Sequence, residues 1–278
     1  MLEKRLLSIF IALHIFFLTD LYALKLTDFK FGAASVLPFY IKDQIKYVIL
    51  SSEQRGDHKG TYDDFSGSRD PGENHPMITA AREFHEEAML EWATGLTLEE
   101  TINYIDIEQT NNTEYIIAYT TPTNKGRVTY IVDFNDYAEA LINNFYSALT
   151  KHISDHYDTI NQLINEFKLS TINVSSMHHS ETLQLLTNFT ETISNQPFWH
   201  YTEKESLATV EWEAFKEAII NQSTNNTTVY ASVIDPITQK SNTKKITLRP
   251  FLAQKLKPFF CNASYEQGNN EKIRFYPT

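Results

Sequence analysis

The chain has 278 residues, of which 42% are hydrophobic and 13% aromatic, so it can bury a substantial core. Its formal net charge of −11 argues against a surface built for nonspecific nucleic-acid binding, because such binding depends on lysine and arginine neutralising phosphates. The single cysteine, Cys261, excludes an internal disulfide and a metal site of several thiolates. We expect Cys261 to be packed as a small hydrophobic side chain.

The N-terminal segment carries a targeting pattern. Two basic residues at positions 4 and 5 precede an apolar run at residues 6–18, which is shorter than the roughly 20 residues that a membrane-spanning helix needs. Ala23 offers a small residue at a cleavage point, although Leu21 is larger than the residue usual two positions earlier. We predict a signal peptide at 1–23 and an exported protein, periplasmic or secreted, that begins near Leu24. A retained membrane anchor is the first alternative, and a first helix of a cytosolic protein is the second.

Strand signals follow at residues 33–40 and 46–50, where apolar side chains dominate. A glycine-bearing loop spans residues 67–73, and Pro76 marks the start of a helix. The predicted order is therefore strand, loop and helix.

That helix gathers acids on one face. Glu83, Glu86 and Glu87 are spaced i, i+3 and i+4, so they project from the same side. Each exposed pair of like charges costs roughly 0.2–0.5 kcal/mol, which favours a bound hard cation, and magnesium suits carboxylate oxygens. A merely solvated face is the alternative explanation. The helix would pack on the sheet through an apolar stripe made of Met77, Ala80, Ala81, Phe84 and Ala88.

This segment resembles the Nudix box, written G-x5-E-x7-R-E-U-x-E-E-x-G-U, in which U is an apolar residue. Gly67 and Glu73 match its first half. Its helical half matches the run Arg82-Glu83-Phe84-x-Glu86-Glu87. The resemblance covers residues 67–90.

Two features depart from the box. Eight residues rather than seven separate Glu73 from Arg82, at a loop-to-helix junction that can absorb the change. Met89 stands where the family has glycine, and methionine tolerates positive φ poorly. We therefore expect the helix to continue through Trp92 to Gly95.

The resemblance implies an α+β fold, a Nudix-like α/β/α sandwich with a mixed β-sheet. It also implies a pyrophosphohydrolase that cleaves a nucleoside diphosphate linked to another moiety, with Mg2+ or Mn2+ as cofactor. Glu86 and Glu87 would bind the metal with the Gly67 carbonyl, and Glu83 would be the catalytic base or a further ligand. Arg82 would pair with Glu73 and fix the loop against the helix. Since zinc needs a tighter ligand set, we expect the nearby histidines to lie on the surface: His58, His75 and His85.

After the box, the pattern predicts strands at 114–120 and 127–134, then helices at 136–168 and 181–193. We assign residues 24–278 to one Nudix domain, which carries a helical insertion at about 136–195. The insertion either caps the site or supports the sheet. A further strand at 203–212 and helix at 213–220 follow.

The start of this strand carries two acids, and by family analogy we expect Glu203, with Glu205 as second choice, to supply another metal ligand. A strand at 227–234 and a helix at 250–260 complete the pattern.

Two functions of other classes stay open. The first is a catalytically impaired Nudix-fold protein that binds a nucleotide, and the second is an interaction protein, tethered or secreted. The expected partner of the enzyme is a small nucleoside diphosphate derivative. Capped RNA is the least expected substrate, because the chain is acidic and predicted to be exported.

Overall fold

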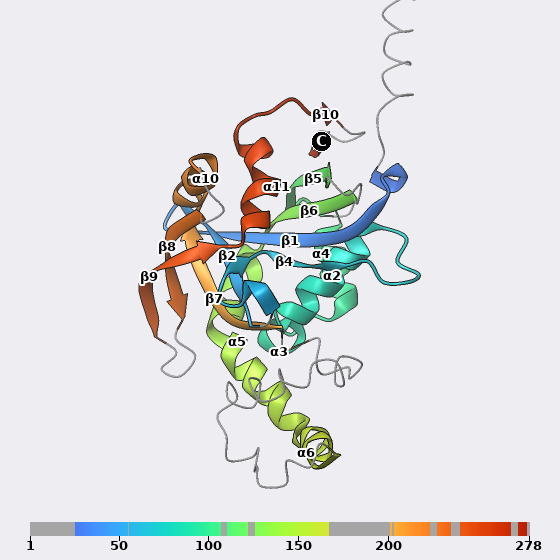
Figure 1. Cartoon of the computed structure of the whole chain (residues 1–278), viewed down its shortest axis with the longest axis vertical. Coiled ribbons are helices and arrows are strands. Elements are labelled where there is room, and N and C mark those ends of the chain that lie inside the picture. The colour runs from blue at the N-terminus through green and yellow to red at the C-terminus, as the bar shows by residue number, and fades with distance from the viewer. Residues whose placement is uncertain are drawn as a thin grey trace, which may run out of the picture.

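The fold is described from a computed structural model (Figure 1). It describes residues 26–54, 56–106, 110–121, 126–166, 201, 203–222, 227–234, 240–267 and 272–276. The predicted signal peptide or anchor at 1–23 and the predicted helix at 181–193 lie outside these residues. No helix within the described ranges is long and apolar enough to cross a membrane.

A single mixed sheet joins all the described strands, in the order β10-β11-β5-β6-β1-β2-β3-β9-β8-β7 with β4 beside β1. β6 runs parallel to β1, whereas β2 and β4 run antiparallel to it. β7 also pairs with β2, so β2, β3, β9, β8 and β7 close into a ring. The strands are β1 (Phe31–Lys42), β2 (Ile45–Glu53), β3 (Tyr62–Asp63), β4 (Phe65–Ser68), β5 (Thr113–Thr120), β6 (Gly126–Asp133), β7 (Lys204–Glu211), β8 (Thr227–Ile234), β9 (Ser241–Leu248), β10 (Glu266–Gln267) and β11 (Ile273–Tyr276).

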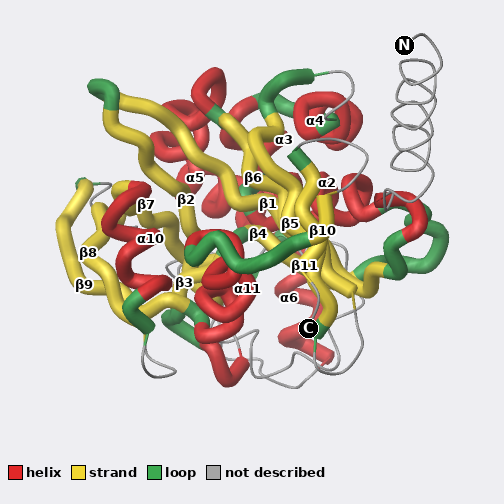
Figure 2. The backbone as a smooth tube through the Cα atoms, turned by 90° about the horizontal axis from the view of Figure 1, so that it is seen from above, coloured by secondary structure: helices red, strands yellow, loops and turns green. Residues whose placement is uncertain are grey.

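Helices lie on both faces of this sheet (Figures 1 and 2). The first face carries α2 (Pro76–Glu87), α3 (Leu90–Thr94), α4 (Leu98–Ile105) and α5 (Asn135–Asp155), which continues into α6 (Tyr157–Glu166). The second face carries α10 (Trp212–Ile220) and α11 (Pro250–Phe260). A short 3-10 helix, η1 (Leu26–Asp28), precedes β1, and another, η2 (Gly56–His58), follows β2. The predicted α+β class, with a mixed sheet between two helical layers, is confirmed.

β1 shows why the sequence forms this arrangement. Ala34 and Val36 belong to the core under α2 and α5, whereas Leu37 and Phe39 belong to the core under α10 and α11. Successive side chains of a strand point to opposite faces, so a strand that is buried on both faces has a continuous apolar sequence. The strands predicted before and after the box are confirmed as β1, β2, β5 and β6.

The end of α2 corrects one expectation. The helix does not continue to Gly95, because Met89 adopts a left-handed conformation (φ 57°, ψ 36°) and α3 begins at Leu90. This conformation costs a non-glycine residue about 1–2 kcal/mol. The side chain of Met89 is fully buried in the core, and burial of such a side chain contributes about 1.5–3 kcal/mol. Core packing therefore offsets the backbone strain.

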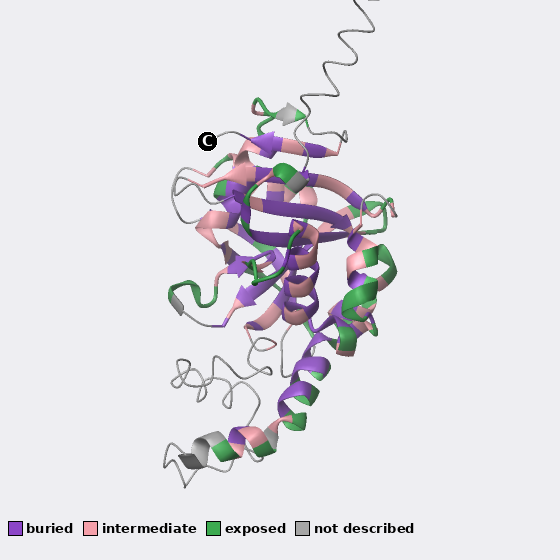
Figure 3. Ribbon diagram, turned by 90° about the vertical axis from the view of Figure 1, so that its right-hand side faces the viewer, coloured by how far each residue is buried: buried purple, intermediate pink, exposed green. Residues whose placement is uncertain are grey.

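α5 belongs to the main core. Leu141, Phe145, Leu149 and Ile153 are buried along one side of it, and the exposed residues lie on the other (Figure 3). The predicted helix at 136–168 is interrupted at His156, where α5 ends and α6 begins. This part of the predicted insertion therefore supports the sheet.

The C-terminal part of the chain was predicted only in part. The strand at 227–234 and the helix at 250–260 are confirmed as β8 and α11. β9, which pairs with β8 along its whole length, was not predicted. Cys261 is exposed, not packed in the core, because α11 ends at Phe260 and the chain turns outward there.

Candidate functional site

Gly67 lies directly against the carboxylate of Glu83. A Cβ atom at position 67 would be 2.0 Å from Cδ of Glu83, a distance that no side chain can tolerate without displacement. β4 brings Gly67 to this position by pairing with β1, opposite Ala34, while α2 packs on both strands. A side chain at position 67 would therefore displace the Glu83 carboxylate, whereas glycine leaves it in place.

Arg82 fastens the loop to the helix through Glu73. Its Nε atom lies 2.8 Å from Oε1 of Glu73, while Oε2 accepts hydrogen bonds from the Asp70 backbone (2.8 Å) and the Thr79 hydroxyl (2.5 Å). Arg82 also donates to the carbonyl of Ser68, at 2.8 Å. Burial alone would raise the pKa of Glu73, but these donors outweigh burial and lower it. The pairing expected from the sequence is thus present.

The same guanidinium faces two further carboxylates. Nη1 of Arg82 lies 2.8 Å from Oε1 of Glu83 and 3.2 Å from Oε2 of Glu86. One positive charge is therefore shared among Glu73, Glu83 and Glu86. Among the described residues, the acids around this guanidinium therefore outnumber it.

Glu83 has the properties of a proton acceptor. Burial raises its pKa to about 7; Arg82 opposes this shift, whereas the charges of Glu86 and Glu203 add to it. A carboxylate with a pKa near 7 can exchange protons at neutral pH.

The interactions of Glu203 and Glu205 differ. Glu203 is close enough to act on the pKa of both Glu83 and Glu87. Burial raises the pKa of Glu205, and its charged neighbours are Lys59 and Lys244, not the box acids. Of the two candidates, Glu203 is therefore the one beside the box.

Glu87 is held differently from the other box acids. Its Oε2 atom accepts a hydrogen bond from the Ser66 backbone at 2.8 Å, and its Oε1 atom lies 3.2 Å from Nζ of Lys204. Burial raises the pKa of Glu87 well above its usual value, and the ammonium of Lys204 opposes this rise. Nothing in the sequence distinguishes Lys204, because a lysine at the start of a strand resembles any solvated residue.

Lys204 begins a second group of buried charges. It donates to Oε1 of Glu53 at 2.7 Å, and Arg249 contacts both Glu53 (3.1 Å) and Asp63 (3.0 Å). Next to Asp63, the fully buried Asp64 pairs with Lys255 of α11. Here each acid has a cation within reach.

The donor set fits a hard divalent cation. The residues that would hold Mg2+ or Mn2+ are Glu83, Glu86 and Glu203 with the Gly67 carbonyl, since oxygen ligands suit these ions. Within the described part of the chain, no three acidic, histidine or cysteine side chains already surround one point. Arg82 and Lys204 occupy carboxylate oxygens, so a metal would compete with them. The assignment of Glu87 as a ligand stays a prediction.

The histidines near the box have separate roles. His58 is exposed, as expected, and His75 caps α2 by accepting a hydrogen bond from the Met77 backbone at 3.2 Å. The expectation of a surface position is wrong for His85, which is buried beside Tyr201 and has its pKa lowered by burial. It lies on a buried side of α2. The many acids of the same helix suggested an exposed surface instead.

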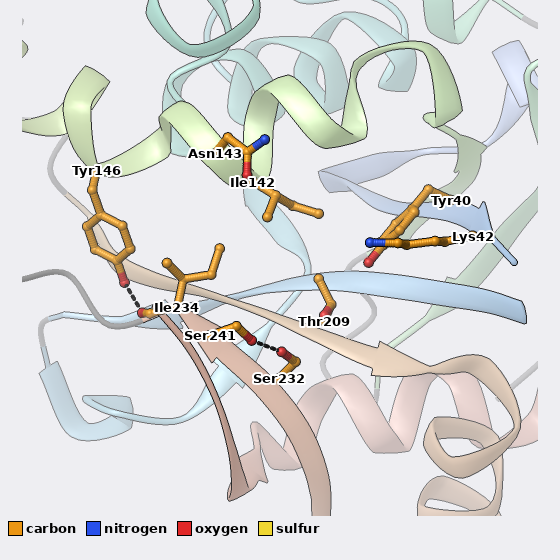
Figure 4. A pocket seen from close by; sticks show the side chains of 9 residues that line it. All are labelled: Tyr40, Lys42, Ile142, Asn143, Tyr146, Thr209, Ser232, Ile234 and Ser241. Atoms are coloured by element: carbon orange, nitrogen blue, oxygen red, sulfur yellow. Dashed lines mark hydrogen bonds between the residues drawn. The ribbon is translucent and has the colours of Figure 1, made fainter. Parts of the chain in front are cut away.

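A cavity of about 460 Å³ lies elsewhere, between α5 and the sheet (Figure 4). The Tyr146 hydroxyl at its edge donates to the carbonyl of Ile234, at 2.8 Å. No acidic side chain lines this cavity, so it is distinct from the box. Its lining residues are Tyr40, Lys42, Ile142, Asn143, Tyr146, Thr209, Ser232, Ile234 and Ser241.

No protein-family model and no curated protein sequence matches this chain. Among solved structures, it is similar to an Ap4A hydrolase of C. elegans in a binary complex, with 18% identity over 37% of this chain and 65% of that chain (TM-score 0.27). It is also similar to the Nudix hydrolase RenU of M. smegmatis, with 19% identity over 38% and 62% (TM-score 0.26).

A third similar structure is the NUDIX domain of Shewanella oneidensis NrtR in complex with ADP ribose, with 14% identity over 38% of this chain and 62% of that chain (TM-score 0.26). The chain spans less than two thirds of the length of each of these three structures. The description of the fold therefore depends on the strands and helices of this chain, and not on these similarities.

Proposed function

We propose that the protein hydrolyses a pyrophosphate bond in a nucleoside diphosphate linked to another moiety, with Mg2+ or Mn2+ bound at the box. The observation that carries this proposal is the carboxylate of Glu83 lying against Gly67, beside an arginine that is shared among Glu73, Glu83 and Glu86. Such an excess of acids around one cation is suited to a metal and a phosphate.

The side chains would divide the work as follows. Glu86 and Glu203, with the Gly67 carbonyl, would hold the cation, which would neutralise the diphosphate and lower the pKa of the attacking water. Glu83, whose carboxylate lies against Gly67, would either accept a proton from that water or act as a further ligand. Arg82 fixes the loop against the helix through its ion pair with Glu73, so the acids are preorganised.

A second candidate function is nucleotide binding without turnover. The contact between Lys204 and Glu87 favours it, because an ammonium already occupies one of the box acids. Binding of a nucleotide in the presence of Mg2+ without release of product would support this candidate.

The test is a magnesium-dependent screen of diphosphate compounds on the purified chain, including nucleotide sugars, dinucleoside polyphosphates and ADP-ribose. We expect release of a nucleoside monophosphate, and Glu86→Gln and Glu203→Gln should each lower kcat at least about a hundredfold. Glu205→Gln is the matched control, because Glu205 interacts with lysines away from the box, and it should keep activity. Full turnover by Glu86→Gln on a verified substrate would refute the assignment.

For the N-terminus, we propose export with cleavage after Ala23. Sequencing of the mature protein from its host should then begin at Leu24. Recovery of the intact chain in the membrane fraction would support the anchor instead.

A further inference from the structure

The environment of Glu87 separates it from the other acids of the box. Its side chain is 2% exposed, and the side chain of Lys204 is 1% exposed. Both oxygens of Glu87 are used, one by the Ser66 backbone and one by the Lys204 ammonium. The side chain of Glu86, by comparison, is 19% exposed and shares Arg82 with two other carboxylates.

Lys204 is fixed in place by more than Glu87. Backbone pairing of β2 with β7 puts Lys204 opposite Glu53, and its Nζ atom lies 2.7 Å from Oε1 of that residue. Glu53 is anchored in turn by Arg249, at 3.1 Å. The pairing with Glu53 therefore holds the ammonium beside Glu87 in a buried environment, where an unpaired charge would be costly.

We propose that Lys204 is a positioning residue that takes the place of a metal ion at Glu87, so that a divalent cation binds through Glu83, Glu86 and Glu203 only. A doubly charged ion on Oε1 of Glu87 would lie next to a fixed positive charge in a buried site, where repulsion is poorly screened. This proposal rests on the proposed function for its metal. It removes Glu87 from the ligand set that the sequence predicts.

The experiment measures Mn2+ binding to the full chain by the EPR signal of free Mn2+, together with the thermal midpoint. Glu86→Gln should weaken Mn2+ binding at least about tenfold, whereas Glu87→Gln should change it less than about threefold. Lys204→Met should tighten Mn2+ binding at least about tenfold, because it exposes Glu87 to the ion. The double variant Lys204→Met/Glu87→Gln should lose this tighter binding. A purely structural role of Lys204 would produce neither the tighter binding nor its loss.

Two results overturn the proposal: loss of Mn2+ binding in Glu87→Gln as large as in Glu86→Gln, or no tightening in a folded Lys204→Met protein. If Lys204→Met does not fold, Glu87→Gln decides alone, because it keeps Lys204 and its contact with Glu53. Failure of the proposed function looks different. In that case the wild-type protein hydrolyses no substrate, while its Mn2+ binding still responds to Glu86→Gln and Lys204→Met as described above.

Discussion

Two acidic clusters in this molecule use the same kinds of residue but are neutralised differently. In the box, Glu73, Glu83 and Glu86 share the single guanidinium of Arg82. In the cluster beside α11, Asp64 has Lys255 as its own partner. Arg249 bridges Asp63 and Glu53, and Lys204 also pairs with Glu53. An excess of acids next to a glycine indicates a place for a ligand, whereas buried charges that each have a partner indicate a role in stabilising the fold.

Glu87 shows that the two clusters meet. By sequence it belongs to the box, one residue after Glu86 on the same helix. By contact it joins the second cluster, where it shares Lys204 with Glu53. The boundary between ligand-binding and structural acids therefore lies between two adjacent residues.

The largest effect should come from breaking a matched pair. Lys255→Met leaves Asp64 buried without its cation, which should lower the free energy of unfolding by about 3–5 kcal/mol. Urea unfolding at pH 7.5 measures the change. Lys257→Met is the control on the same helix, because its partner among the described residues is the Gln222 carbonyl, and it should cost less than about 1.5 kcal/mol. A loss below about 1 kcal/mol for Lys255→Met would contradict the matched-charge interpretation.

A smaller but metal-sensitive effect should follow removal of the shared cation. Arg82→Ala leaves Glu73 without its main partner and increases repulsion between Glu83 and Glu86, so we expect a loss of about 2–3 kcal/mol in EDTA and lower hydrolase activity.

Saturating Mg2+ sharpens the comparison, because it should restore part of the stability of Arg82→Ala but none of that of Lys255→Met. Equal recovery of the two variants would remove the distinction between the clusters.

The smallest effect concerns pH and has opposite signs at Asp64 and at Glu73. Burial raises the pKa of Asp64 from 3.8 to about 6, with Asp63 adding to the shift and Lys255 opposing it. The folded state therefore binds the proton more tightly, and this group stabilises the protein as pH falls from 7 to 5, by about 1–2 kcal/mol. Urea unfolding across this range should show the rise, and Asp64→Asn should reduce it without removing it, because the pKa values of Glu83 and Glu87 are raised in the same direction.

Glu73 gives the reverse sign. Its pKa is lowered, because hydrogen bonds from Arg82, Thr79 and the Asp70 backbone outweigh burial. The stabilising contribution of Glu73 is therefore lost as pH falls below the usual pKa of a glutamate. Glu73→Gln should therefore flatten the acid limb of the stability profile, while Asp64→Asn leaves that limb in place. A wild-type profile that neither variant alters would contradict both assignments.

The parts of the structure that the sequence predicted well are those set by local periodicity. The apolar stripe of α2 packs on the sheet as expected, with Ala80, Ala81 and Phe84 fully buried. β1 and β6 follow from continuous apolar runs. The strand β9 was missed because its first half is exposed and polar, so its pairing with β8 leaves no alternation in the sequence.

Met89 and His85 were mispredicted for one reason. Local preference argues against a left-handed methionine and for an exposed histidine on an acidic helix. Both side chains are instead buried, and packing against distant residues outweighs the local preference. Such contacts cannot be read from neighbours in the sequence.

The sequence by itself determined that Glu83, Glu86 and Glu87 share one side of a helix behind Gly67, because helical geometry fixes the direction of residues three and four apart. Only the tertiary structure decided which cation each acid meets. Arg82 comes from the same helix, but Lys204 is brought to Glu87 by the pairing of β7 with β2, far along the chain. Charges act through space, so the spacing of acids along a helix does not reveal the ammonium that strand pairing places beside one of them.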